Sequence, residues 1–194
     1  EASNGSLHPV TAQLVGAASS LGGSVSVICP GGLGSDEARG ISGVSKVISV
    51  EGKCFETYDC MAWTTAISPL IEGDLVLSSS SAIGREMSAA IAAKKGFPAV
   101  QDITSLSEGV SVTRSIFSGK AIEEVGVSLP CALSIRANTF DAAESGGEAE
   151  LATVNVNEDV SVAVKEALAK AGEKLDVAEA DIVISGGREM GDPS

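Results

Sequence analysis

The sequence predicts an α/β fold: a parallel sheet with helices on both faces, followed by an antiparallel β addition. Between residues 7 and 95, segments with helical spacing of apolar residues alternate with short β-branched runs, which is typical of parallel α/β folds. Hydrophobic residues make up 44% of the chain but aromatic residues only 3%. The core must therefore consist of Ala, Val, Ile and Leu, which suits helices packed on a parallel sheet.

The first half of the chain carries the alternating pattern. A helix is predicted over residues 7–21, with Pro9 in its first turn and Gly22-Gly23 at its end. Ser35 is a predicted N-cap. Strands are predicted over 24–29, 44–50 and 74–78, and helices over 35–41, 58–71 and 82–95. Since the pattern opens on a helix, we expect the strand that would precede it to be missing from this sequence.

The second half reads differently. Residues 110–117 alternate apolar and polar side chains, which predicts a strand, and residues 120–128 and 131–136 continue as β in the same antiparallel addition. A flexible polar loop is expected over 142–150 and a strand over 151–157. Residues 160–171 fit a helix or a strand. The apolar run 182–184 predicts a short buried strand.

Charge and cysteine content exclude several function classes. A net charge of −13 and a pI near 4.4 argue against nucleic acid and anionic membranes as partners. No apolar run has the length of a membrane span, so no membrane insertion is expected. The four cysteines form no Cys-x-x-Cys pair, so we expect buried free thiols and no metal site. A Ser-His-Asp triad could use only His8, and no catalytic group is assigned.

Two segments follow strands and open helices. The glycines of residues 30–34, with Glu51 further on, sit where a dinucleotide fingerprint would, but a third glycine at the required spacing is absent and a tight turn is favoured. Ser78 to Gly84, followed by Arg85, offer hydroxyls at a helix N-terminus. They predict either a phosphate or nucleotide site or, more simply, N-capping by Ser80 or Ser81.

Other polar and aromatic residues have simpler interpretations. Arg114, Arg136 and Asp141 are expected in surface or interface pairs, and Trp63 and Met61 in the core or an interface. At the end of the chain, Arg188 follows two glycines. Its planar fork of donors can hold a phosphate or a flavin at such a turn. The alternative is a disordered tail after the last strand.

Several segments in order resemble the alpha subunit of electron transfer flavoproteins. They are Leu21-Gly-Gly-Ser-Val-Ser-Val27, Ser81-Ala-Ile-Gly-Arg85, Ala89-Ala-Ile-Ala-Ala-Lys94, Gln101-Asp-Ile103, Val112-Thr-Arg-Ser-Ile-Phe-Ser-Gly-Lys-Ala121, Ser134-Ile-Arg-Ala-Asn-Thr-Phe-Asp-Ala-Ala143 and Val183-Ile-Ser-Gly-Gly-Arg188. The opening segment, residues 1–11, is similar as well. The resemblance implies a Rossmann-like domain of the adenine-nucleotide-hydrolase type.

The resemblance also implies a function. The family carries electrons through FAD from acyl-CoA dehydrogenases to a membrane quinone oxidoreductase, as a heterodimer of the alpha subunit with an electron transfer flavoprotein beta subunit. Residues 1–150 match its α/β scaffold domain, and residues 151–194 a linker and the beginning of the FAD-binding domain. Arg188 matches an FAD-contacting arginine. Glu189 stands where the family usually has glycine.

These matches lead to further expectations. We expect a fragment that scaffolds the heterodimer without holding FAD tightly, an electron carrier rather than an enzyme. In the family the beta subunit holds AMP and the alpha domain does not. The expected compartment is the mitochondrial matrix, with the bacterial cytoplasm as the alternative. Two other functions stay open: a free-standing adenine-nucleotide-binding module of the universal-stress type, and a non-enzymatic dimerisation scaffold.

Overall fold

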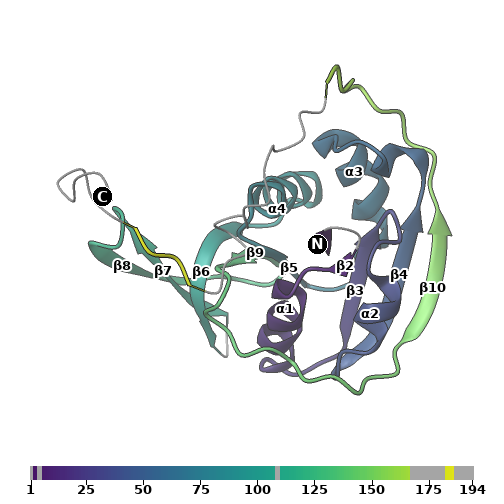
Figure 1. Ribbon diagram of the computed structural model, residues 1–194. Coiled ribbons are helices and arrows are strands. Elements are labelled where there is room, and N and C mark those ends of the chain that lie inside the picture. Colours follow the sequence, from purple (N-terminus) through teal and green to yellow (C-terminus); the bar gives the residue numbers. More distant parts are fainter. Residues whose placement is uncertain (1, 4–5, 108–109, 167–181, 186–194) are drawn as a thin grey trace, which may run out of the picture. The chain divides into compact units, whose positions relative to one another are not determined.

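The computed structural model describes residues 2–3, 6–107, 110–166 and 182–185, and divides the chain into two units, Glu1–Ala163 and Val164–Ser194. Every helix and strand of the described residues lies in the first unit (Figure 1). In the second unit the described residues, 164–166 and 182–185, form neither helix nor strand. The expected division into two domains at residue 150 stays a prediction.

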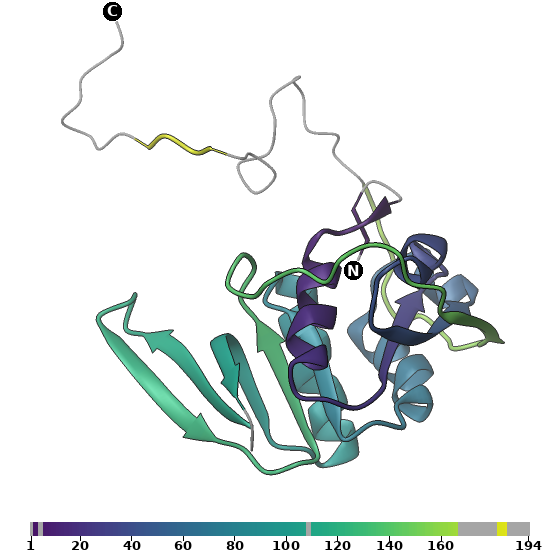
Figure 2. The same cartoon turned by 90° about the horizontal axis from the view of Figure 1, so that it is seen from below.

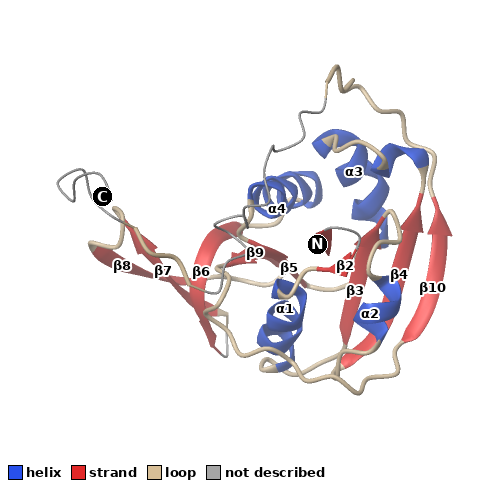
Figure 3. Ribbon diagram, in the orientation of Figure 1, coloured by secondary structure: helices blue, strands red, loops and turns tan. Residues whose placement is uncertain are grey.

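Helices and strands alternate through the first unit, as Figure 3 shows by colour. The helices are α1 (Val10–Ser19), α2 (Ser35–Arg39), α3 (Cys60–Ile67) and α4 (Ala82–Lys95), with 3-10 turns at Lys53–Phe55 and Ser68–Leu70. The strands are β1 (Ala2–Ser3), β2 (Ser6–Leu7), β3 (Val25–Pro30), β4 (Val44–Glu51), β5 (Leu75–Ser79), β6 (Ala99–Ser107), β7 (Ser111–Ile116), β8 (Ala121–Gly126), β9 (Cys131–Ile135) and β10 (Glu150–Asn155).

The α/β class is confirmed, but the strands form two main sheets rather than one. The first has the order β10-β4-β3, with β4 parallel to both neighbours. The second has the order β5-β9-β6-β7-β8. In Figures 1 and 2, α1 and α2 lie on the opposite side of the strands from α3 and α4, so helices cover both faces as predicted.

Strand β9 corrects the prediction for residues 131–136. We expected it in the antiparallel addition, yet it lies between β5 and β6 and runs parallel to both. All five of its residues are buried. A strand covered on both faces has a continuous apolar run instead of alternation, and this was the neglected signal. The antiparallel addition is real but consists of β7 and β8, which pair in sequence after β6.

Strand β6 is missing from the sequence-based prediction. Asp102 has a positive φ of 62° and the ladder to β9 shifts register between Val100 and Ile103. This irregularity puts both of those apolar side chains into the core although they are three positions apart. A β-bulge inserts one residue and so breaks the two-residue period by which strands are recognised.

The first predicted helix, over 7–21, is shorter than expected. Helix α1 runs over Val10–Ser19 with Pro9 as its N-cap, because residues 6–7 form strand β2.

Two further corrections concern α2 and α3. Ser35 is the first residue of α2 rather than its N-cap, because Gly34 holds the cap position with φ 72°. The predicted helix over 58–71 is shorter, since α3 ends at Ile67 and Pro69 lies in the 3-10 turn that follows. Proline lacks the N–H that would continue the α-helical hydrogen bonds.

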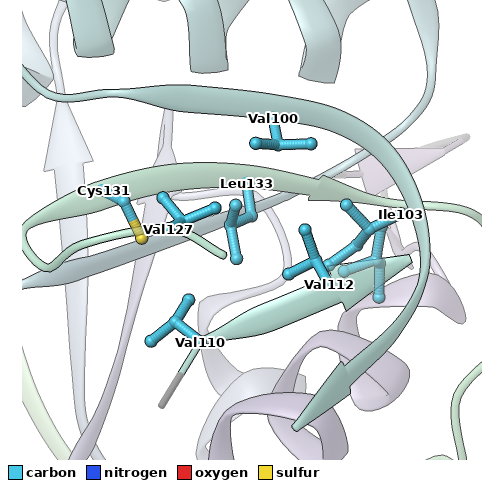
Figure 4. Packing of buried hydrophobic residues seen from close by; sticks show 8 residues of the cluster. Val100, Ile103, Val110, Val112, Val127, Cys131 and Leu133 are labelled. Carbon is cyan, nitrogen blue, oxygen red and sulfur yellow. The ribbon is translucent and has the colours of Figure 1, made fainter. Parts of the chain in front are cut away.

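A compact apolar cluster stabilises the five-stranded sheet (Figure 4). Ile103, Val112, Leu133 and Ile135 are fully buried in it. A second cluster lies around β3, β4 and α2, with Val47 and Ala38 fully buried. The cores are aliphatic, in line with the composition.

The carboxyl-terminal segments depart from expectation. The loop before β10 is held by backbone hydrogen bonds, since the N–H groups of Gly146 and Gly147 donate to Gly40. Over 160–166 the chain is neither helix nor strand. The predicted buried strand over 182–184 is wrong. Residues 182–185 belong to no sheet and are exposed, and the Ile182 side chain is 81% exposed. Among the described residues no strand pairs with this run, and a strand needs a partner for its backbone groups.

Candidate functional site: the carboxyl edge of the five-stranded sheet

The serine-rich segment at the end of β5 begins α4 by side-chain capping. Ser81 is the N-cap, and its Oγ accepts a hydrogen bond from the Gly84 N–H at 2.9 Å. Gly84 lies so close to β5 that a Cβ there would sit 2.3 Å from the Ser79 carbonyl oxygen. The capping interpretation is therefore confirmed for Ser81, with glycine required at position 84 by the close approach of the backbone.

Beside this cap, four polar residues from three segments form what we call the carboxyl-edge cluster: Ser80, Asp102, Ser134 and Arg136. Ser80 and Ser134 share a hydroxyl–hydroxyl hydrogen bond of 3.0 Å, and the Asp102 N–H donates to the Ser134 Oγ at 3.0 Å. Ser134 is completely buried within β9. These bonds connect the residue after β5 with β9 and with the irregular part of β6.

The charged pair of the cluster is bidentate. Arg136 Nη2 lies 2.6 Å from Asp102 Oδ2, and Arg136 Nε lies 3.2 Å from Oδ1. The hydrogen bond from Arg136 lowers the pKa of Asp102, opposed by partial desolvation and assisted by Ser80 and by the charge of Arg85. The pKa of Arg136 is raised in return. The sequence prediction that Arg136 takes part in a surface pair is thereby confirmed.

The polar side chains at this edge connect β5, β6 and β9 to one another. Its hydroxyls and charges are hydrogen-bonded to one another, and Ser81 occupies one N–H at the start of α4. A phosphate or nucleotide at Ser78 to Gly84 stays a prediction.

The other glycine segment is a tight turn, as favoured. Gly31, Gly32 and Gly34 all have positive φ, and the Gly31 N–H donates to the Val50 carbonyl at 2.8 Å. Only glycine adopts such a series of left-handed conformations without strain. Glu51 lies beside this turn and accepts a hydrogen bond from Ser49 at 3.3 Å.

The remaining candidates have structural roles. The Nδ1 atom of His8 accepts a hydrogen bond from the Val10 N–H at 3.2 Å. All four cysteines are free, and Cys29, Cys54 and Cys131 are buried as predicted, whereas Cys60 is half-buried. Burial raises the pKa values of the three buried thiols. In the described part of the chain, no three His, Cys, Asp or Glu side chains gather to hold a metal ion.

The aromatic and basic residues also find partners. Trp63 is half-buried and packs edge-on against Phe55 and Tyr58. Met61 is 68% exposed, so the core placement predicted for it is wrong and an interface stays a prediction. Arg114 pairs with Glu123 of the neighbouring strand at 2.5 Å. Asp141 is exposed in the loop beyond β9.

Sequence reasoning missed Asp59, which connects α3 with the chain beyond β10. Its Oδ1 accepts from the N–H groups of Met61 and Ala62, and its Oδ2 accepts from both the N–H and the Oγ of Ser161, each at 2.8 Å. The side-chain bond from Ser161 is the first cause that lowers its pKa to about 2, ahead of the bonds from backbone N–H groups. An Asp just before an apolar helical run was the available signal.

Arg188 and Glu189 lie outside the described residues. The expected flavin contact of Arg188 therefore stays a prediction. Of the residues that the structure does describe, none belongs to a helix long and apolar enough to cross a membrane.

Comparison with known proteins identifies the family. The model of the electron transfer flavoprotein domain matches residues 1–160. The chain is 27% identical to the probable mitochondrial electron transfer flavoprotein subunit alpha of Caenorhabditis elegans, covering 95% of this chain and 58% of that protein. It is 28% identical to subunit alpha of Bacillus subtilis (97% and 62%) and 27% to that of Mycobacterium leprae (98% and 63%). The chain thus spans about three fifths of the length of these relatives. With a family model matching most of its length, this chain belongs to the electron transfer flavoprotein family.

Proposed function

We propose that this chain is the scaffold portion of an electron transfer flavoprotein alpha subunit. In that role it pairs with a beta subunit and, through FAD, carries electrons from acyl-CoA dehydrogenases to a membrane quinone oxidoreductase. The observation that carries the proposal is the family match over residues 1–160, supported by several relatives that are named subunit alpha. Residues 1–150 are the scaffold domain, and residues 151–194 are the linker and the start of the flavin domain.

Within this proposal FAD accepts and donates the electrons, and the protein's task is to position it. The described polar groups at the carboxyl edge bond to one another, which supports a flavin site elsewhere, with Arg188 as the contact carried by this chain. The 194 residues alone are expected to hold FAD weakly and to act as a carrier subunit without catalysis of their own. Relatives named mitochondrial support the matrix as the compartment, and the bacterial relatives keep the cytoplasm as the alternative.

The test is a visible absorption spectrum of the alpha protein purified together with its beta partner, before and after an acyl-CoA dehydrogenase and its substrate are added. Flavin bands that bleach would support the proposal. A colourless preparation without a copurifying partner would contradict it. AMP or ATP bound by the chain would then favour the nucleotide-binding module.

Arg188 is tested in the same complex. Arg188→Ala removes the planar fork, and Arg188→Lys keeps the charge without it. We expect weaker FAD retention on gel filtration in both variants, more so in Arg188→Ala. Unchanged retention in both would remove Arg188 from the flavin site.

A further inference from the structure

Strand β10 forms an open edge of the three-stranded sheet. It is the outer strand beside β4, and among the described residues no strand pairs with its far side (Figure 1). Its pairing with β4 continues from Glu150 to Asn155 without a register shift. The far side of an edge strand carries unpaired N–H and C=O groups, which can pair with the backbone of another chain. The outer edge of β10 is therefore a candidate docking surface.

The hydrogen bonds to β4 show which backbone groups of β10 are unpaired. The N–H of Val156, directly after the strand, donates to the Glu51 carbonyl at 2.8 Å. Backbone groups of successive residues in a strand point alternately to its two edges, so the even-numbered residues of β10 direct theirs toward β4. The odd-numbered residues then direct their N–H and C=O groups away from the sheet. These residues are Leu151, Thr153 and Asn155.

The sequence of β10 does not protect this edge from pairing. Natural proteins protect exposed edges with proline, with charge, with β-bulges or with a covering segment. The four central residues of β10, 151–154, are uncharged and include no proline. Strand β8, the outer strand of the other main sheet, instead has Glu123 and Glu124 at its centre. Adjacent carboxylates repel a second strand of like charge, so β8 has a protection that β10 lacks.

The edge is also held in place from within the protein. Arg39 Nε donates to the Ala149 carbonyl at 3.1 Å before the strand, and the bond from Val156 fixes its end. The side chains of Ala152 and Val154 are half-buried. A partner would therefore meet a strand that is ordered before binding, which reduces the entropy lost on association.

Charge indicates what kind of segment fits this edge. The sequence has no Lys or Arg between Arg136 and Lys165. Carboxylates lie at both ends of β10, and among the described residues none of them belongs to an ion pair. They are Glu148 and Glu150 at the beginning and Glu158 and Asp159 after the end. In the register with β4, Lys46 is opposite Glu150 and partly neutralises the beginning of the strand.

The same charges disfavour a second copy of this chain as the occupant. Antiparallel pairing of two β10 strands would bring the acidic beginning of one beside the acidic end of the other. Each copy also carries a net charge of −13. A segment with cations at both ends has the complementary charge.

We propose that the outer edge of β10 is a docking site for an extended segment of another protein, with an uncharged β-branched centre and Lys or Arg at both ends. The segment adds a strand antiparallel to β10 and is six residues long, the length of β10. Its backbone pairs with the outward groups of the odd-numbered residues, and its cations meet the carboxylates at the two ends. The inference goes beyond the proposed electron-carrier role and does not depend on it.

The probe is a capped peptide, Lys-Thr-Val-Thr-Val-Lys, added to the whole chain while amide hydrogen exchange is followed residue by residue. One control peptide has Pro-Pro in place of the central Val-Thr, which keeps the charge but removes backbone donors in either register. A second control has Glu in place of both lysines, which keeps the pairing but reverses the charge.

Two variants of the chain test the edge itself. Thr153→Pro removes an outward N–H that makes no bond to β4, and Pro is tolerated at such positions of an edge strand. Thr153→Lys keeps the backbone and places a cation at the centre of the edge, where it repels the probe. Exchange in β9 reports whether each variant keeps its fold, so a failure of one to fold leaves the other as the test.

We expect the probe to slow exchange at Leu151, Thr153 and Asn155 by about tenfold or more, with β7 and β8 unchanged. Both control peptides and both folded variants should lose most of this protection. Unchanged exchange at millimolar probe, or equal protection by the Pro-Pro peptide, would overturn the proposal. Equal protection by the Glu-ended peptide would overturn the stated chemistry of the partner. Slow exchange at these amides without peptide, together with a dimeric mass, would assign the edge to a second copy instead.

Discussion

Strand β9, in the middle of the five-stranded sheet, and strand β10, at the edge of the three-stranded sheet, are stabilised by different means. In the five-stranded sheet, β9 lies between two parallel neighbours with every residue buried. In the three-stranded sheet, the outer strand β10 alternates exposed and half-buried residues. Its ends are fixed by hydrogen bonds instead: Arg39 Nε donates to the Ala149 carbonyl before the strand, and the Val156 N–H donates to Glu51 after it.

This difference shows where sequence changes should act. Side-chain burial distributes stability through the five-stranded sheet, so a core truncation there weakens the whole unit. Strand β10 pairs with β4, although about a hundred residues separate the two strands in the sequence. Hydrogen bonds at both ends of β10 hold it in place. Losing one of them should loosen that segment and leave the core intact.

The largest expected effect is at Leu133, the centre of β9. Leu133→Ala removes a fully buried side chain and leaves a cavity among the aliphatic residues of its cluster. The free energy of unfolding should fall by about 2–5 kcal/mol in urea titrations. Ile122→Ala on β8 is the control, because its side chain is 77% exposed and the change should stay within about 0.5 kcal/mol. Equal effects of the two would contradict a core centred on β9.

The next effect concerns the start of α4. Ser81→Ala deletes the Oγ that accepts the Gly84 N–H, and should lower the free energy of unfolding by about 1 kcal/mol. Ser81→Asp provides another good N-cap and should recover most of the loss. If Ser81→Asp were as unstable as Ser81→Ala, the hydroxyl would act through its other contacts and not as a cap.

A smaller effect belongs to the ion pair of the carboxyl-edge cluster. Asp102→Asn should cost about 1 kcal/mol or less, since Arg136 and Asp102 are 40% and 34% exposed and water screens them. The pKa of Asp102 is lowered in the folded state. Its contribution is therefore present above the unfolded pKa, about 3.9 for Asp, and is lost as the pH falls through the folded value.

The comparison for this pair is a pH series of urea titrations. The difference in unfolding free energy between the wild type and Asp102→Asn should be constant near neutral pH and shrink below about pH 4. A difference that persists at the lowest pH would mean that the aspartate acts by shape and not by charge.

The sequence was sufficient where the hydrophobic pattern follows one period. Helix α4 begins and ends where predicted, because Ser81 and Gly96 flank a regular apolar face. The pattern fails at β6, where the positive φ of Asp102 shifts the period. It also misassigned β9, because a strand that directly follows a hairpin was assumed to extend it. Long-range pairing decides both cases, and local propensity does not carry that information.

The candidate site was predictable only in part. The cap at Ser81 follows from local sequence, but the cluster of Ser80, Asp102, Ser134 and Arg136 combines residues more than fifty positions apart. The sequence gives these residues separate interpretations, because only the order of the strands in the sheet shows that they lie close together. The same holds for Asp59 and Ser161, which lie about a hundred positions apart.

Substitution of Asp59 is expected to change the global stability least, because its effect is confined to the segment around Ser161. Asp59→Asn keeps one oxygen for the N–H groups of Met61 and Ala62, but its amide nitrogen cannot accept from Ser161. We therefore expect faster amide exchange at Ser161 and its neighbours, with α3 and the midpoint of thermal unfolding nearly unchanged. Asp59→Ala is the contrast, because it loses the helix cap as well and should also accelerate exchange in the first turn of α3.

The pH dependence of the Asp59–Ser161 contact sharpens the comparison between β9 and β10. With a folded pKa of about 2, lowered chiefly by the Ser161 hydroxyl, Asp59 stays ionised in the native protein well below its ordinary value of 3.8. Its contribution is complete above that ordinary value and is lost as the pH falls toward about 2. Protection at Ser161 should therefore survive at pH 4 and vanish near pH 2 in the wild type, while Asp59→Asn lacks it throughout. If the variant retained wild-type protection at neutral pH, the segment after β10 would be held by backbone hydrogen bonds alone. A side chain would then fix only the beginning of β10, through Arg39.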